Sequence, residues 1–171
     1  QKICNSDGGL SSAIGASLDD YAYFGGSLTS NGDLDGDGFT DLVVGSYGDR
    51  DGGYLTGAAY VLFLDNKGWV GAAQKISNSY GSLSSFYTLQ ADDRFGESVA
   101  IVGDLTGNGI SDLVVGADRD YDGGSNTGAV YVLFFVDKAY EVKSAQKISN
   151  SHGGLSSFYT LEADNYFGFS S

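Results

Sequence analysis

The first residues with the types and spacing for chemistry form an aspartate-rich run between residues 33 and 41. Carboxylates occupy positions 1, 3, 5 and 9 of this run, and a glycine occupies position 6. Hard oxygen donors in a tight loop are the ligands that Ca²⁺ takes in proteins. We predict a calcium site formed by the side chains of Asp33, Asp35, Asp37 and Asp41 and the carbonyl of Phe39.

A second run of the same length begins at residue 104 and keeps both end aspartates, but it replaces the middle two by a hydroxyl and an amide. Its predicted ligands are Asp104, Thr106, Asn108, the carbonyl of Ile110, and Asp112. Affinity in such loops follows the number of charged ligands, so we expect the second site to be weaker. Position 12, which is glutamate in an EF-hand, is Val44 or Val115 here, and this excludes an EF-hand.

The alternative for both runs is an aspartate–glycine turn without metal, and the second run with fewer carboxylates is the more open to it. Two further acidic stretches, residues 49–53 and 118–124, are interpreted as solvated loops because the pattern is not repeated faithfully between them. Whether residues 118–126 also bind a cation stays open at this point.

Catalytic chemistry has no comparable support in the sequence. His152 is the only histidine and aligns with Asp7 and Tyr80 in the other copies, which is typical of a variable turn residue. Cys4 aligns with serines and is expected to be a small, partly buried residue. No phosphate loop, zinc motif or nucleophile elbow is present, so we predict that the chain is not an enzyme.

The net charge of −13 comes from 22 acidic residues against 9 basic ones. This balance argues against nucleic acid and against an anionic membrane surface as partners. No apolar run approaches the ~18 residues that cross a bilayer, so membrane insertion is not expected.

Internal repetition organises the whole chain. The segment Gln-Lys-Ile recurs at residues 1, 74 and 146, and Phe-Gly recurs at residues 24, 95 and 167. Four β-prone runs per unit, at 95–103, 112–117, 128–135 and 145–149, are separated by glycine and aspartate clusters. The apolar run 131–135 is nearly continuous, so both faces of its sheet should be covered. We predict an all-β fold of four-stranded antiparallel β-propeller-type blades in tandem.

The repeats divide the chain into four parts. Residues 24–94 and 95–166 are the two complete blades. Residues 1–23 are expected to be a partial repeat with an outer strand and a connection, and residues 167–171 the first strand of a further blade. Two blades do not close a propeller, so the chain is part of a longer one or its blade faces are covered by other chains. A non-closing head-to-tail contact would build a filament.

The quoted motifs resemble the FG-GAP repeat of integrin α subunits: Phe-Gly, the Asp-x-Asp-x-Asp-Gly-x-x-Asp loop, Asp-Leu-Val-Val-Gly and Gly-Ala-Val-Tyr-Val. The family has Gly-Ala-Pro at the end of the second strand of each repeat, and the corresponding residues here are Gly116, Ala117 and Asp118. The proline is therefore missing, and the loop that follows this strand is expected to differ from that of the family. The resemblance implies two structural Ca²⁺ sites in a non-catalytic, extracellular or cell-surface binding or adhesion protein. Its partners would be a protein or glycan ligand or copies of itself. An extracellular fibre and a propeller region attached to a secreted hydrolase remain alternatives.

Overall fold

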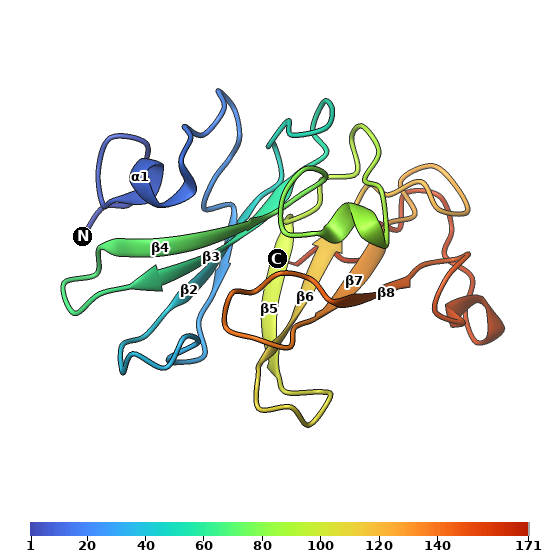
Figure 1. Ribbon diagram of the computed structural model, residues 1–171. Coiled ribbons are helices and arrows are strands. Elements are labelled where there is room, and N and C mark those ends of the chain that lie inside the picture. Colours follow the sequence, from blue (N-terminus) through green and yellow to red (C-terminus); the bar gives the residue numbers. More distant parts are fainter. Residues whose placement is uncertain (171) are drawn as a thin grey trace.

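The protein forms two four-stranded antiparallel sheets that lie side by side (Figure 1). The structure is a computed structural model, and it describes residues 1–170. The first sheet has the order β1-β2-β3-β4 and the second the order β5-β6-β7-β8. The strands are β1 (Ser27–Thr29), β2 (Leu42–Ser46), β3 (Ala58–Leu64), β4 (Val70–Ile76), β5 (Ser98–Gly103), β6 (Asp112–Ala117), β7 (Ala129–Phe134) and β8 (Ser144–Ile148).

The two sheets repeat one another in register as well as in order. Val44 pairs with Tyr60 in the first sheet, and Val115 pairs with Tyr131 at the equivalent place in the second. β-Branched and aromatic residues dominate these central strands, as expected for side chains that fit a pleated surface packed on both sides. The predicted all-β fold of tandem propeller-type blades is therefore confirmed, and each sheet is called a blade from here on.

The main core lies between the blades. Val43, Ala59 and Val61 of the first blade belong to one buried cluster with Leu113 and Leu133 of the second. A smaller cluster on the other face of the first blade gathers Tyr60, Leu62 and Leu10. As a result six of the seven β3 residues are buried, whereas buried and half-buried residues alternate along β7. Both faces of the first blade are thus covered within the described residues, whereas one face of the second blade keeps half-buried residues, and its covering stays a prediction.

The second and third Phe-Gly motifs bridge to the preceding blade instead of opening a strand. Phe95 is fully buried, bridges Gly57 of the preceding blade, and lies three residues before β5 begins. The main chain comes so close here that a Cβ on Gly45 would stand 2.0 Å from the Gly96 carbonyl oxygen. Gly96 itself has φ +92°, a left-handed conformation that glycine adopts without steric cost. Glycines at these positions are thus required by the blade junction.

The structure differs from the sequence prediction at both ends of the chain. Residues 1–3 form no strand, Cys4 makes an isolated bridge to Asp7, and a short helix α1 (Leu10–Ile14) follows. A lone outer strand has no third strand to pair with in this chain, so its amides find no ladder. The 3₁₀ turns η1 (Leu83–Ser85) and η2 (Leu155–Ser157) occupy the place of α1 in the later copies. Phe167 bridges Gly128, residues 168–170 form no strand, and residue 171 lies outside the described part.

Helices play a small part in the fold. Among residues 1–170, no helix has the length and apolarity that crossing a membrane requires.

Candidate metal centre

The first aspartate loop connects β1 to β2 and projects from the lower end of the first sheet in Figure 1. Asp41 fixes its base and is fully buried. One carboxylate oxygen of Asp41 accepts the Leu34 amide at 2.7 Å, and the other accepts the Leu64 amide at 2.9 Å. Asp41 therefore binds both ends of the loop to the sheet.

Three carboxylates converge above this base. Asp33, Asp35 and Asp37 each offer an oxygen, and these three oxygens lie within 4.8 Å of one another. Asp33 also accepts the amides of Asp37 at 3.0 Å and Gly38 at 2.8 Å. Loss of hydration opposes ionisation of Asp33, but the loop amides outweigh it and lower the pKa of this carboxyl. The pKa of Asp35 is raised by loss of hydration, with the neighbouring carboxylates acting in the same direction.

This arrangement suits a hard cation. A bound Ca²⁺ would relieve the mutual repulsion of three carboxylates and would take further oxygens from its surroundings. Asp41 lies outside the converging group, and each of its oxygens accepts a backbone amide. A carboxylate oxygen has a second lone pair, so these bonds do not prevent Asp41 from contacting an ion. The Phe39 amide donates to Asp37 at 2.8 Å, so the main chain of Phe39 is attached to one of the converging carboxylates.

The second loop, between β5 and β6, has the same frame with less charge. Asp104 accepts four loop amides, including that of Gly109 at 2.6 Å, and their hydrogen bonds lower the pKa of this carboxyl. Asp112 is fully buried and accepts the amides of Leu105 at 2.9 Å and Phe135 at 3.2 Å.

The middle positions of the second loop are partly engaged in other contacts. Thr106 donates its hydroxyl to Asp104 at 3.3 Å. Asn108 donates its side-chain amide to the Phe135 carbonyl at 2.7 Å and accepts the Ile110 amide at 2.8 Å. The second loop thus has two carboxylates where the first has four, and one of its neutral side chains is bonded to a carbonyl.

Lys138 is a contact that the sequence did not indicate. It lies in the β7–β8 connection of the second blade and donates to the main-chain carbonyl of Asp35 at 2.6 Å. Its charge also helps to lower the pKa of Asp33. No short-range pattern identifies it, because 103 residues separate the two partners.

The interpretation of residues 49–53 and 118–124 as solvated loops is wrong for the aspartates Asp49, Asp118 and Asp120, which are buried, although other residues of both loops are exposed. Asp49 is 1% exposed and Asp120 is 2% exposed, and each accepts a tyrosine hydroxyl, from Tyr60 at 2.7 Å and from Tyr131 at 2.8 Å. The charge is balanced within the protein, because buried carboxylates are stable when they are paired and hydrogen-bonded.

A lysine from the recurring Gln-Lys-Ile segment provides that balance in each blade. Lys75 lies 3.0 Å from Asp49, and Lys147 lies 2.8 Å from Asp120 and 2.9 Å from Asp122. Within residues 118–126, the ammonium group of Lys147 thus pairs with two of the carboxylates. The signal for it was present in the sequence, since aspartate, tyrosine and lysine recur together in both copies.

Asp93 adds one further carboxylate to the network of the second blade only. It is 2% exposed, accepts the Gln90 amide at 2.7 Å through one oxygen, and has no described partner for the other. Loss of hydration, followed by the charge of Asp120, raises the pKa of Asp93 to about 7. The first blade has Ala22 at this position.

Comparison with known proteins finds sequence similarity over the same two repeats. The FG-GAP repeat family matches residues 24–62 and 95–133, which are the first three strands of each blade with their aspartate loops. Integrin alpha-PS2 of Drosophila melanogaster is 36% identical over 120 residues, covering 65% of this chain and 8% of the relative. Integrin alpha-7 of Mus musculus is 33% identical over 141 residues, covering 81% and 10%.

A relative with a different name is similar over much of the same region. The phosphatidylinositol-glycan-specific phospholipase D of Bos taurus is 33% identical over 134 residues, covering 77% of this chain and 15% of the relative. The chain thus spans about a tenth of the length of the curated relatives it matches. With two repeats, two aspartate loops and two four-stranded blades in the same order, this chain belongs to the FG-GAP, integrin α-like family.

Proposed function

We propose that this chain is a calcium-stabilised, non-catalytic β-repeat module of an extracellular or cell-surface binding or adhesion protein. The observation that carries the proposal is the convergence of the Asp33, Asp35 and Asp37 oxygens within 4.8 Å. Loops with few charged ligands fill at the millimolar Ca²⁺ found outside cells, which suits the weaker second loop.

The donor set fits calcium and does not fit a softer metal, because every candidate ligand is an oxygen. In the first loop the ion would be held by Asp33, Asp35 and Asp37, the Phe39 carbonyl and Asp41. In the second it would be held by Asp104, Thr106, Asn108, the Ile110 carbonyl and Asp112. Bound Ca²⁺ would neutralise the loops and hold β1 to β2 and β5 to β6, with no part in a reaction.

Calcium titration tests this proposal. Differential scanning calorimetry should show a thermal midpoint that rises with Ca²⁺ and falls on chelation, because an ion bound only by the folded loops stabilises that state. Isothermal titration should resolve two sites. Asp35→Asn should weaken the tighter site and leave the weaker one unchanged.

Glu162→Gln provides the matched control, since Glu162 is an exposed carboxylate outside both loops. Its calcium titration should equal that of the unchanged protein. A thermal midpoint indifferent to chelator, or equal losses from Asp35→Asn and Glu162→Gln, would contradict a calcium role for the first loop.

A second candidate function is a structural subunit that assembles head to tail with copies of itself. Specific support comes from the half-buried Val130, Val132 and Phe134 on the open face of the second blade. Their counterparts Ala59, Val61 and Phe63 are buried against a neighbouring blade. Unpaired repeat faces of this kind are covered by stacking.

The third candidate is a repeat region attached to a catalytic domain. It is favoured by the phospholipase D relatives, whose name describes an enzyme. The described residues provide no catalytic group for this, so any such activity would reside elsewhere in the whole protein.

A further inference from the structure

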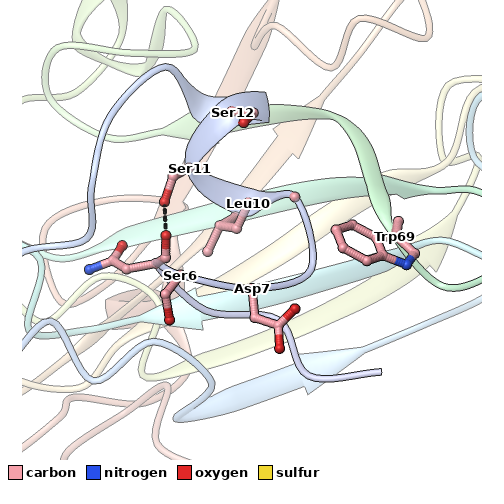
Figure 2. Close-up of a pocket in the computed structure, with 8 residues that line it drawn as sticks. Ser6, Asp7, Leu10, Ser11, Ser12 and Trp69 are labelled. Carbon is pink, nitrogen blue, oxygen red and sulfur yellow. Dashed lines mark hydrogen bonds between the residues drawn. The ribbon is translucent and has the colours of Figure 1, made fainter.

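A hollow of about 210 Å³ lies at the outer edge of the first blade, between α1 and the loop that joins β3 to β4. Figure 2 shows Trp69 on one side of it, with Asp7 and the first turn of α1 on the other. The remaining lining is mostly polar and small, with one leucine: Asn5, Ser6, Gly9, Leu10, Ser11 and Ser12. It is separate from both aspartate loops.

The main chain of Trp69 is fixed by hydrogen bonds, whereas its indole ring makes none to the described residues. Its amide donates to the Asp65 carboxylate at 2.9 Å, and its carbonyl accepts the Asp65 amide at 2.9 Å. The side chain is 44% exposed, and the indole nitrogen has no hydrogen bond to any described residue. A hydrogen-bonded turn therefore places a partly exposed indole beside the hollow.

The opposite wall offers unclaimed polar atoms. One oxygen of Asp7 accepts the Gly8 amide at 2.9 Å and the Gln1 side chain at 3.3 Å, while the other accepts nothing from residues 1–170. The Ser12 hydroxyl is likewise without a described partner. Asn5 accepts the Leu18 amide and donates to its carbonyl, so this wall is fixed in place.

The second copy shows which of these residues the blade itself requires. Asn5, Ser6 and Ser12 recur as Asn78, Ser79 and Ser85, whereas Asp7 is replaced by Tyr80 and Trp69 by Glu141. There Glu141 pairs with Lys143 at 3.1 Å, and Lys75 lies 5.3 Å from the centre of the Tyr80 ring. The combination of a carboxylate and an indole in the lining of one hollow is thus particular to the first copy.

The hollow does not depend on what precedes the first blade. Ser79 and Ser85 stay exposed at the junction where a preceding blade is present. A further blade packed before the first one would leave the equivalent Ser6 and Ser12 accessible by the same geometry.

We propose that this hollow binds one neutral saccharide residue, which gives the binding module of the proposed function its ligand class and rests on that function. The ring carbons of a hexose would stack on the Trp69 indole, and its hydroxyls would bond to Asp7, Ser6 and Ser12. Serine hydroxyls both donate and accept hydrogen bonds, as the hydroxyls of a sugar do. A basic peptide side chain only donates hydrogen bonds and therefore needs acceptors alone. The Asp7 charge and the net charge of −13 exclude acidic sugars from this wall.

Tryptophan fluorescence reads this site directly, because Trp69 is the only tryptophan. The chain in saturating Ca²⁺ is titrated with the methyl glycosides of glucose, galactose, mannose and N-acetylglucosamine, and separately with an acetylated lysine peptide. At least one neutral glycoside should change the emission saturably. Asp7→Asn keeps the acceptor for Gly8 and should weaken binding about tenfold, because a hydrogen bond to a charged group is lost.

Glu141→Gln at the equivalent place in the second copy should leave the titration unchanged. Trp69→Leu, followed by calorimetry, should abolish binding. Saturation by the lysine peptide alone, no response to any glycoside, or equal effects of Asp7→Asn and Glu141→Gln would each overturn the saccharide assignment. Calcium stabilisation measured on the same sample separates this failure from failure of the proposed function.

Discussion

At the scale of single residues, the second oxygen of Asp93 is one of six buried side-chain atoms that have no hydrogen-bond partner among residues 1–170. Asp120, Asp122 and Lys147 line the same hollow as this carboxyl. Burial and then the charges of Asp120 and Asp122 raise the pKa of Asp93 to about 7, although the Gln90 amide and the charge of Lys147 act in the opposite direction. The unfolded chain releases the same proton near its ordinary value of 3.8. The folded form therefore binds more protons between these values, so stability falls as pH rises through that window.

Asp93→Asn should remove this pH dependence. The amide keeps the acceptor for Gln90, just as Asn165 accepts the Glu162 amide at 2.8 Å in the third copy. We expect the free energy of unfolding of the variant to exceed that of the unchanged protein at pH 8 by up to about 4 kcal/mol, with the difference disappearing near pH 4. Chemical denaturation at both pH values measures it. Asp20→Asn, at an exposed carboxylate, is the control, and equal effects at both pH values would count against the assignment.

The sequence predicted the two aspartate loops by residue number because their spacing is local. The convergence of Asp33, Asp35 and Asp37 follows from positions 1, 3 and 5 of one turn. It could not predict Lys138, which reaches the first loop from the other blade. It also misjudged Asp49 and Asp120, because an acidic stretch looks the same in a sequence whether water or a buried lysine neutralises it.

At the scale of elements, the strands and their order followed from short apolar runs, whereas their boundaries did not. The run 95–103 begins as β5 only at Ser98, because Phe95 and Gly96 are used to dock onto the preceding blade. This docking depends on Gly57, which is distant in sequence. Residues 1–4 likewise match a strand in sequence pattern, but they form none here because the described residues offer them no neighbouring strand.

Gly45→Ala tests the docking directly. A Cβ at residue 45 would stand 2.0 Å from the Gly96 oxygen and 2.2 Å from the Ser27 hydroxyl, so the two blades would have to separate. We expect the free energy of unfolding to fall by about 1–3 kcal/mol, as is usual for overpacking. Urea denaturation of Gly45→Ala and of Gly71→Ala gives the comparison. Gly71 has only the Phe63 oxygen near it, at 3.9 Å, and a loss as large there would refute the close-approach argument.

At the scale of the whole molecule, the two blades are covered unequally. The first lies between α1 with its flanking residues and the second blade, while the second keeps a half-buried face of Val130, Val132 and Phe134. If copies of the chain stack, this face is the one they use, because its counterpart in the first blade is already a blade interface.

Self-association should therefore depend on the open face. Light scattering over a concentration series should show association, and Val132→Lys should reduce it by placing a charge on that face. Val102→Lys changes a valine of β5 that is already 40% exposed, and it should leave association unchanged. Electron microscopy of concentrated samples distinguishes filaments from discrete particles. A strictly monomeric protein at every concentration would remove the fibre candidate.

The contact between Lys138 and the Asp35 carbonyl connects the first aspartate loop to the second blade. Ion binding by the first loop and docking of the two blades are therefore linked equilibria, and the coupling free energy between them is reciprocal. An ion that orders the first loop would strengthen the docking of the blades, and blades already docked would raise the affinity of the loop for the ion by the same factor. Pulling the blades apart by force would then lower calcium occupancy, so the first loop would respond to mechanical load.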